Sequence, residues 1–554
     1  MASATERSLV RGESSGGDLT AASAVGLAGI MFALAMVVLF QQLSLTDTVA
    51  GVRLVGILGV GLLALGVSVI GLGVASRYGA LSATPRASAG LLSGVVSGLL
   101  WAVVGGLAGA RVLGLGTVGW LLCAVVVGAG AAGFTVLTRE DVGTTVPAGA
   151  FTALLGLVVL VTIGPSWEWA LGWEQQPASL TAPITVPTMT LAGSLVGGWA
   201  AAVAYGGFGA RGRHLGAYLL VYLNAGTIVG VLLVLVGFTV FKGLPGLFRG
   251  FEVGLGVGRQ ITVEHYLFLP FIDFAPGFSL AFDLPFKWPF VMTGVALLND
   301  VNGVWPAIVG TVWLVIGAVL LAVPLGVGAA IFLTEYAERG RFTQLVEVAT
   351  NGLWSTPSIV FGLFGAAFLV PRFANQKSIL AGTITLGFML LPLVVITTRE
   401  SLLAVPDEYR DASAALGVSK WQTIRSVVLP AAIPGVTTGV ILGVGRIAGE
   451  TAPILLTMTG AVALPANQAL NVLGSFRFTA TPPFVANEAL LQATTALPYQ
   501  LYALITAGVG KSSNIADIDQ FRWTTALVLL VVVLSFYAIG IATRYYFRQK
   551  LNHE

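Results

Sequence analysis

Apolar residues gather along the chain in runs of about 20, while charged residues fall mostly in the stretches between these runs. A helix of about 20 residues crosses a hydrocarbon core about 30 Å thick, so each run predicts a membrane-spanning helix. The pattern therefore predicts an all-α, polytopic membrane protein with about twelve transmembrane helices. The predicted spans are Ala21–Phe40, Leu54–Ala75, Ser88–Ala110, Thr117–Leu137, Val146–Ile163, Thr188–Ala210, Gly216–Phe241, Trp305–Thr334, Gly352–Val370, Leu380–Thr398, Ala431–Thr457 and Trp523–Thr543.

The distribution of basic residues between the spans predicts the orientation. An even number of spans places both termini on one side of the membrane. With that side in the cytoplasm, the tails and short inner loops hold about 16 Lys and Arg residues, against about 4 in the short outer loops. Cytoplasmic loops are enriched in these residues, so both termini are predicted to be cytoplasmic. The long segments Lys242–Val304 and Thr459–Arg522 then lie outside, and Arg399–Pro430 lies inside.

The chain is predicted to divide near Arg211. Residues 1–20 form a cytoplasmic tail, residues 21–210 a six-helix membrane extension of unknown role, and residues 211–554 a second six-helix part. Only the second part combines proline, threonine and charge within its spans. The halves are therefore not repeats of one another, and the candidate functional residues lie in residues 211–554.

Composition excludes several functional classes. The chain is 56% hydrophobic and only 10% charged, which excludes an ordinary soluble enzyme. A net charge of +3 without a basic stripe argues against nucleic-acid binding. Cys123 is the single cysteine, and the three histidines are far apart, so neither an intrachain disulfide nor a metal site is expected. Gly510-Lys511-Ser512 has Ile505 in place of the first glycine of a phosphate-binding loop, so no ATPase site is expected either.

The cytoplasmic segment Arg399–Pro430 predicts two short helices joined by a turn. Pro406 and Asp407 are typical of a helix start, because proline suits the first turn and negative charge is favoured there. Gly417 is expected to end the first helix, and Pro430 is expected to end the second. The first helix has a narrow apolar face formed by Ala412, Ala415 and Leu416. Such a pair of amphipathic helices is predicted to be a docking element.

The spacing of this segment resembles the EAA loop of ABC importer permeases. In that family the loop inserts into a groove on a cytoplasmic ATPase subunit and transmits closure of the ATP sites to the transmembrane helices. Asp411 stands for the family's Glu, Ser413 for its second Ala and Val427 for its Ile, and each keeps charge or approximate size. The alternative is an amphipathic loop on the bilayer surface. The resemblance implies ATPase coupling through Asp411, Ala412, Ala415, Leu416, Gly417 and Pro430.

A second constellation lies inside the eleventh predicted span. Arg446 and Glu450 are spaced i, i+4, so on a continuous helix they share one face and neutralise each other. The sequence Gly449-Glu450-Thr451-Ala452-Pro453 resembles the signature of PstA-type phosphate permeases, and Ala452-Pro453 favours this type over the paired PstC type. Arginine suits phosphate because its planar fork makes bidentate hydrogen bonds to oxyanions. The alternative is a structural ion pair that holds two helices in register.

Other stretches extend the resemblance over about Gly216–Phe547. Pro324-Leu325-Gly326 and Glu335-Tyr336-Ala337 match the family's second core helix, and Thr356–Gly365 matches its third. Pro357 is expected to break the third helix. Beside it, Ser358 is predicted to donate a hydrogen bond to an anion or to a neighbouring helix. The substrate path implied by the resemblance consists of Arg446, Glu450, Thr451 and Ser358.

The resemblance implies a permease subunit of a phosphate importer, built on a type I six-helix core. Its expected partners are a PstC-type permease, a cytoplasmic ATPase dimer that consumes the ATP, an extracytoplasmic phosphate-binding protein and membrane lipid. The chain itself is expected to bind no cofactor. Candidate contacts with the binding protein are Phe251-Glu252, Glu264-His265 and Phe271–Phe274. The rival hypotheses are a permease for sulfate or molybdate, a secondary transporter driven by an ion gradient, and a scaffold built on the first six spans.

Overall fold

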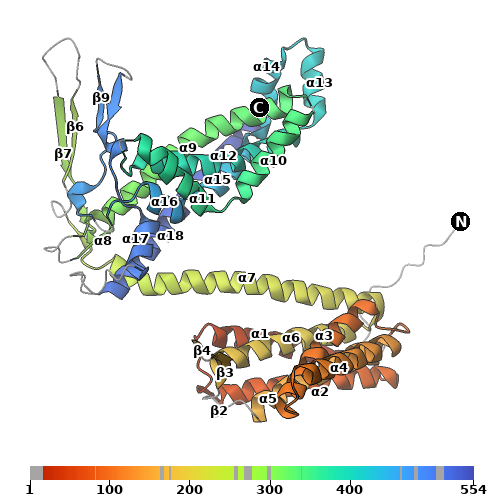
Figure 1. Cartoon of the computed structure of the whole chain (residues 1–554). Coiled ribbons are helices and arrows are strands. Elements are labelled where there is room, and N and C mark those ends of the chain that lie inside the picture. Colours follow the sequence, from red (N-terminus) through yellow and green to blue (C-terminus); the bar gives the residue numbers. More distant parts are fainter. Residues whose placement is uncertain are drawn as a thin grey trace. The chain divides into compact units, whose positions relative to one another are not determined.

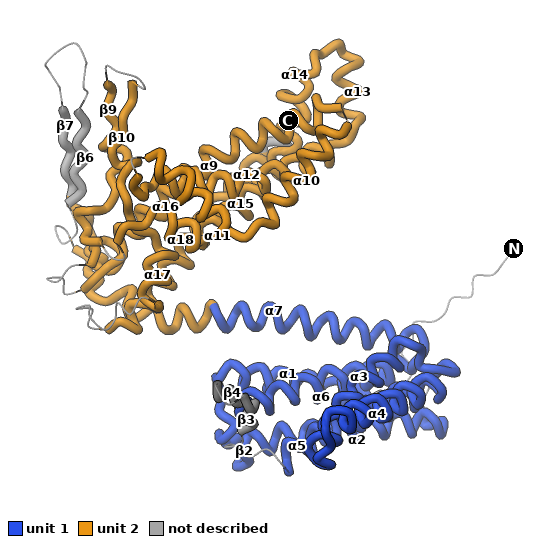
Figure 2. Tube along the Cα trace, viewed as in Figure 1, with its two compact units in different colours: residues 1–235 blue, residues 236–554 orange. Residues whose placement is uncertain are grey.

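The computed structural model divides into two compact units, residues 1–235 and 236–554, and each is described by itself (Figures 1 and 2). It describes residues 16–553 except 82, 162–167, 174–175, 255–259, 267–276, 296–300, 339, 374, 462–463, 480–483 and 507–516. Within these residues, 11 helices are long and apolar enough to cross a membrane, and a bent helix pair makes up to 12. The prediction of an all-α, polytopic membrane protein is confirmed.

The first unit contains six long helices and the start of a seventh. Their bounds are α1 (Gly16–Leu39), α2 (Leu54–Arg77), α3 (Leu91–Leu107), α4 (Thr117–Leu137), α5 (Glu140–Val161), α6 (Ala182–Tyr205) and α7 (Gly209–Leu247), which continues past the boundary between the units. Two antiparallel hairpins join β1 (Thr48–Val49) to β2 (Val52–Arg53) and β3 (Glu168–Trp173) to β4 (Gln176–Thr181). α5 begins six residues before its predicted span because two buried acids, Glu140 and Asp141, belong to its first turn.

Glycines set the close packing of α2 against α5. A Cβ atom on Gly149 would lie 2.6 Å from the carbonyl oxygen of Gly66, and one on Gly156 would lie 2.7 Å from that of Gly59. A Cβ on Gly66 would in turn meet the backbone nitrogen of Ala153. Small residues let the two backbones approach, which increases the dispersion contacts that hold helices together in lipid.

The second unit contains the helices after α7 and three antiparallel pairs of strands. The helices are α8 (Pro289–Met292), α9 (Trp305–Ile331), α10 (Arg341–Ser355), α11 (Ser358–Phe364), α12 (Ile379–Leu403), α13 (Asp407–Ala415), α14 (Lys420–Thr423), α15 (Leu429–Ala448), α16 (Ala452–Thr457), α17 (Leu497–Thr506) and α18 (Ile518–His553). The paired strands are β5 (Glu252–Val253) with β8 (Phe286–Lys287), β6 (Gln260–Tyr266) with β7 (Gly277–Asp283), and β9 (Phe476–Phe478) with β10 (Val485–Asn487).

The core of the second unit lies where α12 packs between α9 and α15 (Figure 1). Leu314 of α9, Leu390 of α12 and Ile447 of α15 are almost completely buried in one hydrophobic cluster. Gly387 lets α12 approach α9 closely, since a Cβ on Gly387 would lie 2.7 Å from the side chain of Leu321.

Pro430 does not end the helix that precedes it, contrary to the sequence prediction. Residues Lys420–Ala448 form one span of 29 residues. A π-helical segment, Ile424–Val428, comes directly before α15, and Pro430 occupies the first turn of α15. The wider π turn changes the backbone pairing that proline would otherwise disrupt, so the helix continues.

We expect Gly66→Ala to destabilise the first unit while Gly71→Ala does not. The new methyl group at position 66 meets the backbone of α5, whereas a Cβ at position 71 of the same helix meets nothing within 4 Å. Overpacking of this kind costs about 1–3 kcal/mol. Thermal unfolding of the purified full chain in detergent measures the difference. Equal midpoints for the two variants would show that this close contact does not limit stability.

Candidate functional site

Two helix interruptions define the candidate site. α10 ends at Ser355 and α11 begins at Ser358 at an angle of 101° to it. Thr356 between them is extended, with φ −67° and ψ 132°, as expected of a residue that precedes a proline. The second interruption separates α15, which ends at Ala448, from α16, which begins at Ala452. The predicted spans Gly352–Val370 and Ala431–Thr457 are therefore both broken helices.

The segments that follow the two interruptions pack directly against each other. A Cβ on Gly362 of α11 would lie 2.8 Å from the Cα atom of Pro453 of α16, and one on Gly365 would lie 2.5 Å from the side chain of Thr457. Both glycines are needed because any larger side chain would separate the two helices. Two motifs that are distant in the sequence thus form one structural element.

The N-terminal end of α12 satisfies the last carbonyl groups of α16. The amide of Ser378 donates to the carbonyl oxygen of Thr457 at 3.0 Å, and Nζ of Lys377 donates to that of Leu455 at 2.8 Å. Carbonyls in the last turn of a helix have no partner within that helix. These contacts therefore fix the short helix in place despite its six residues.

Arg446 and Glu450 face each other across the end of α15. Nε of Arg446 lies 3.8 Å from Oε1 of Glu450, and the two side chains are 33% and 18% exposed. Glu450 follows the last helical residue, so the pair does not share one face of a continuous helix as predicted. The separation is longer than a hydrogen bond. Among the described residues the guanidinium of Arg446 donates no hydrogen bond, which leaves its N–H groups available.

The guanidinium of Arg446 stacks on Trp354, which lies just before the interruption between α10 and α11. The carbon at the centre of the guanidinium lies 4.2 Å from the centroid of the Trp354 ring, near the C-terminal end of α10. A cation over an aromatic face is attracted to it, and stacking fixes the guanidinium plane. Sequence reasoning missed this residue because nothing in the local pattern links it to Arg446.

Thr451 and Ser358 lie at the starts of the two short helices. Thr451 precedes α16, and its carbonyl oxygen accepts the amide of Leu455 at 3.0 Å. Ser358 is the first residue of α11 and is half-buried. Neither side chain is hydrogen-bonded to Arg446 or Glu450 in the part of the chain that the structure describes. The four predicted path residues therefore belong to adjoining elements without forming one hydrogen-bonded cluster.

The cytoplasmic segment forms the predicted pair of helices, α13 and α14, which we call the knuckle (residues 407–423). Gly417 has φ +71°, a left-handed conformation that favours glycine, and a Cβ there would meet nothing within 4 Å. Ser419 then starts α14 with a capping box, in which its hydroxyl accepts the amide of Gln422. Asp411, Ala412, Ala415 and Leu416 are all exposed, and Leu416 is 82% exposed.

Arg410 ties the knuckle to the π-helical segment Phe332–Tyr336, which continues α9, and the sequence did not reveal this contact. Its Nη2 donates to Oε1 of Glu335 at 2.9 Å and to the carbonyl oxygen of Leu402 at 3.0 Å. The Glu335 side chain is 8% exposed. Lys420 adds a second tie, because its Nζ lies 5.1 Å from the ring centroid of Tyr336. The Glu335-Tyr336 motif thus holds both helices of the knuckle, through pairings across a long sequence separation.

Other sequence-predicted positions are less informative. Arg399 of α12 pairs with Glu347 of α10, with 2.6 Å between Nη2 and Oε1. Phe251 packs edge to face on Trp288, so this candidate contact residue belongs to an aromatic cluster. Phe271–Phe274 and Gly510-Lys511-Ser512 lie outside the described residues. Glu264 and His265 belong to β6, and the structure describes only their backbone.

Comparison with known proteins points to one family. The sequence profile described as "Binding-protein-dependent transport system inner membrane component" matches residues 322–486. The phosphate transport system permease protein PstA of Haemophilus influenzae is 33% identical over 252 residues, which cover 46% of this chain and 78% of that protein. The permease protein PstA 1 of Mycobacterium tuberculosis is 40% identical over 169 residues, which cover 30% of this chain and 55% of that protein.

The chain thus spans only about half the length of the mycobacterial relative. Among solved structures, an inward-facing methionine ABC transporter covers 44% of this chain and 94% of its own, at 17% sequence identity and a TM-score of 0.32.

We expect Arg410→Gln to loosen the knuckle. The substitution removes the charge that pairs with the buried carboxylate of Glu335, and an unpaired buried charge is costly. Amide hydrogen exchange of the full chain should speed up about tenfold over residues 405–418, which corresponds to a local opening cost about 1.4 kcal/mol lower.

Arg425→Gln is the matched control, because Arg425 is exposed and has no ion pair among the described residues. Exchange that is the same in both variants and in the wild type would contradict the role given to Arg410.

Proposed function

We propose a function from one premise: this chain belongs to the family of binding-protein-dependent transport system inner membrane components. It is an ABC importer permease component and a multi-pass inner membrane protein, and it has no catalytic role of its own. Such a permease works with an ATPase and a binding protein. We propose further that the transported substrate is phosphate and that the chain is the PstA-type subunit of the importer.

The observation that carries the phosphate proposal is the geometry around Arg446. The guanidinium stacks on Trp354 and lies 3.8 Å from the carboxylate of Glu450, so its N–H groups are oriented yet unused among the described residues. A tetrahedral oxyanion accepts two parallel hydrogen bonds from such a fork. The two short-helix starts bring the hydroxyl groups of Ser358 and Thr451 to adjoining elements as further donors. Sequence identity of 33% and 40% to two proteins named phosphate permeases supports the same substrate.

Glu450 gives the proposed site a way to release the anion. Its carboxylate and phosphate compete for the same guanidinium, because both are negatively charged. When no phosphate is present, the carboxylate offsets the charge of Arg446 inside the membrane. We propose that Glu450 replaces phosphate at Arg446 as the anion moves on, which keeps binding weak enough for transport.

The knuckle is the proposed contact with the ATPase. Leu416 and Trp421 are 82% and 54% exposed, so the knuckle presents two large apolar side chains that a partner could cover. Arg410 and Lys420 connect the knuckle, through Glu335 and Tyr336, to the π-helical segment that continues α9. Movement of the knuckle would therefore displace α9 as well.

A single helix links the knuckle to Arg446. The span Lys420–Ala448 is continuous over 29 residues, which corresponds to about 43 Å at 1.5 Å per residue. Lys420 belongs to the knuckle at one end and Arg446 lies in the last turn at the other. A continuous helix transmits a displacement along its axis. We propose that closure of the ATPase moves Arg446 through this helix.

The remaining assignments follow from the sequence. We propose that both termini are cytoplasmic, that a PstC-type subunit is the second permease, and that an extracytoplasmic phosphate-binding protein delivers the substrate. We also propose that the chain is organised as predicted, into a tail (1–20), an extension (21–210) and a core (211–554). The family profile matches only residues within the proposed core.

Uptake of radiolabelled phosphate tests the substrate. In cells that lack this gene, with no other phosphate importer induced, we expect uptake at low external phosphate to fall about tenfold or more and the wild-type gene to restore it. Excess unlabelled phosphate should compete, whereas sulfate and molybdate should not. Normal phosphate uptake in the deletion strain would refute the assignment, and competition by sulfate or molybdate would redirect it to another oxyanion.

Gly417 variants test the coupling to ATP. A β-branched residue at φ +71° costs about 1–2 kcal/mol in backbone strain, whereas asparagine tolerates this conformation. We therefore expect Gly417→Val to lose most phosphate uptake while Gly417→Asn keeps most of it, at equal amounts in the membrane. Unimpaired uptake by Gly417→Val would favour a transporter that does not use the knuckle, such as one driven by an ion gradient.

A further inference from the structure

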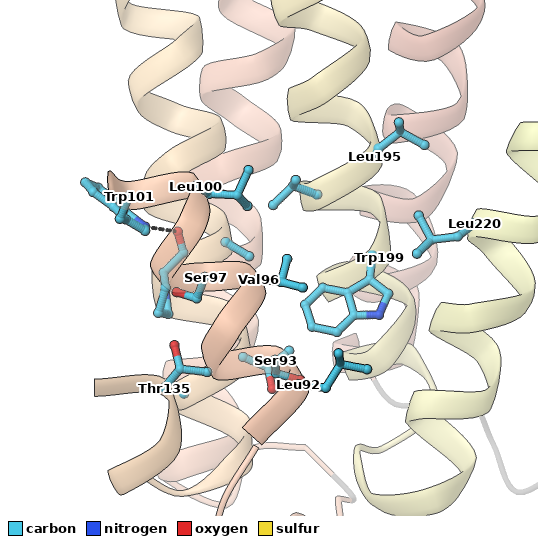
Figure 3. A pocket seen from close by; sticks show the side chains of 15 residues that line it. Leu92, Ser93, Val96, Ser97, Leu100, Trp101, Thr135, Leu195, Trp199 and Leu220 are labelled. Carbon is cyan, nitrogen blue, oxygen red and sulfur yellow. Dashed lines mark hydrogen bonds between the residues drawn. The ribbon is translucent and has the colours of Figure 1, made fainter. Parts of the chain in front are cut away.

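The first unit contains a cavity of about 270 Å³ between α3 and the helices α5, α6 and α7 (Figure 3). We propose that this cavity holds one acyl chain of an anionic membrane phospholipid. Leu92, Val96 and Leu100 of α3 form one wall, and Leu195 and Trp199 of α6 and Leu220 of α7 form the opposite wall. This inference is independent of the proposed transport function.

The cavity exists because α3 packs chiefly along α4. A Cβ on Gly105 of α3 would lie 2.7 Å from the carbonyl oxygen of Cys123, and one on Gly98 would lie 3.0 Å from the Cβ of Ala132. The small residues of α3 therefore face α4, and its large apolar residues face elsewhere. The α3–α4 hairpin holds itself together and leaves a space toward α6 and α7 that no side chain fills.

The chemistry of the walls suits hydrocarbon. Nε1 of Trp101 donates to the carbonyl oxygen of Pro147 at 3.1 Å, and the hydroxyl of Thr135 donates to that of Ala131 at 2.9 Å. The buried hydroxyl oxygen of Ser97 has no partner. The lining also contains the hydroxyls of Ser93 and Thr144 and the indole N–H of Trp199, but most of its side chains are hydrocarbon. Apolar cavities of about 150 Å³ stay dry and bind benzene, so this larger one can accept a chain segment.

The mouth of the cavity opens toward lipid. Leu92 and Val96 line the cavity and are also 79% and 47% exposed. Leu99 and Val103 continue this exposed apolar surface along α3, within a window hydrophobic enough to span the membrane. An acyl chain of the surrounding bilayer therefore reaches the cavity without crossing a polar surface.

The charge at one end of the bundle selects an anionic headgroup. Arg77 ends α2, Arg86 lies shortly before α3, and Arg211 belongs to the first turn of α7. All three are exposed and have no ion pair among the residues described here. The cavity reaches this end, because its lining includes Leu92 and Ser93 in the first turn of α3. Each such arginine contributes about 1 kcal/mol toward an anionic membrane surface.

Two acidic residues at this end, Glu140 and Asp141, do not cancel that charge, because both are buried and paired. Oε2 of Glu140 accepts the amides of Arg86 at 2.8 Å and Gly209 at 3.1 Å, and Oε1 lies 3.4 Å from Nε of Arg213. Asp141 accepts the hydroxyl of Ser76 at 3.1 Å and lies 3.3 Å from Nε of Arg139. The exposed arginines are thus left for a headgroup phosphate.

Lipid retention tests the site. The full chain is reconstituted in nanodiscs of equimolar phosphatidylglycerol and phosphatidylcholine and extracted in mild detergent, and bound lipids are then counted by native mass spectrometry. We expect one retained lipid, with phosphatidylglycerol favoured about tenfold. Ser97→Phe fills the cavity and should lower retention about tenfold. Leu99→Phe, on the lipid-facing side of the same helix, should not.

The headgroup contribution is tested separately. Arg86→Gln combined with Arg211→Gln should keep a bound lipid but lose the preference for phosphatidylglycerol. The control is Arg53→Gln, because Arg53 precedes the first turn of α2 and so lies at the opposite end of that helix from Arg77. This control variant should keep the preference for phosphatidylglycerol. Equal retention of both lipids by the wild type would overturn the proposal, and so would equal retention by the Ser97 and Leu99 variants. The wild-type preference decides the question even where Ser97→Phe fails to fold.

Discussion

The hydrocarbon interior of a membrane offers no hydrogen-bond partners to an interrupted backbone, and this constraint locates the candidate site. The chain interrupts two apolar stretches, at Thr356-Pro357 and at Gly449–Thr451, so the freed groups must be covered by protein. The segments that follow, α11 and α16, therefore pack on each other at Gly362 and Gly365. Lys377 and Ser378, directly before α12, complete the arrangement by satisfying the last carbonyls of α16.

The same constraint explains why charge is tolerated there. Arg446 lies at the end of a broken helix, where its neighbours are a carboxylate and an aromatic ring and not lipid tails alone. Both charged side chains remain partly exposed, so neither pays the full cost of burial. A site with a positioned but incompletely paired guanidinium is suited to transient anion binding, whereas a tightly hydrogen-bonded ion pair would be suited to holding two helices together.

Much of the architecture was predictable, because hydropathy and turn chemistry are local signals. The spans, the break at Pro357 and the turn at Gly417 followed from neighbouring residues. Pro430 misled because its effect depends on the π-helical segment before it, which no composition rule reveals. The partnerships of Arg410 with Glu335 and of Arg446 with Trp354 were missed because they join residues far apart in the sequence. Tertiary packing alone brings these side chains together.

The role of Arg446 is open to a single decisive measurement. Proteoliposomes that contain the full chain with a second permease, the ATPase and the binding protein would be assayed for ATP-dependent uptake of radiolabelled phosphate. We predict that Arg446→Gln lowers uptake about tenfold or more, and that Arg446→Lys does not restore it, because lysine lacks the planar fork that binds phosphate and stacks on Trp354. Arg425→Gln serves as the exposed control. Wild-type uptake by Arg446→Gln would contradict the proposal that phosphate passes this arginine.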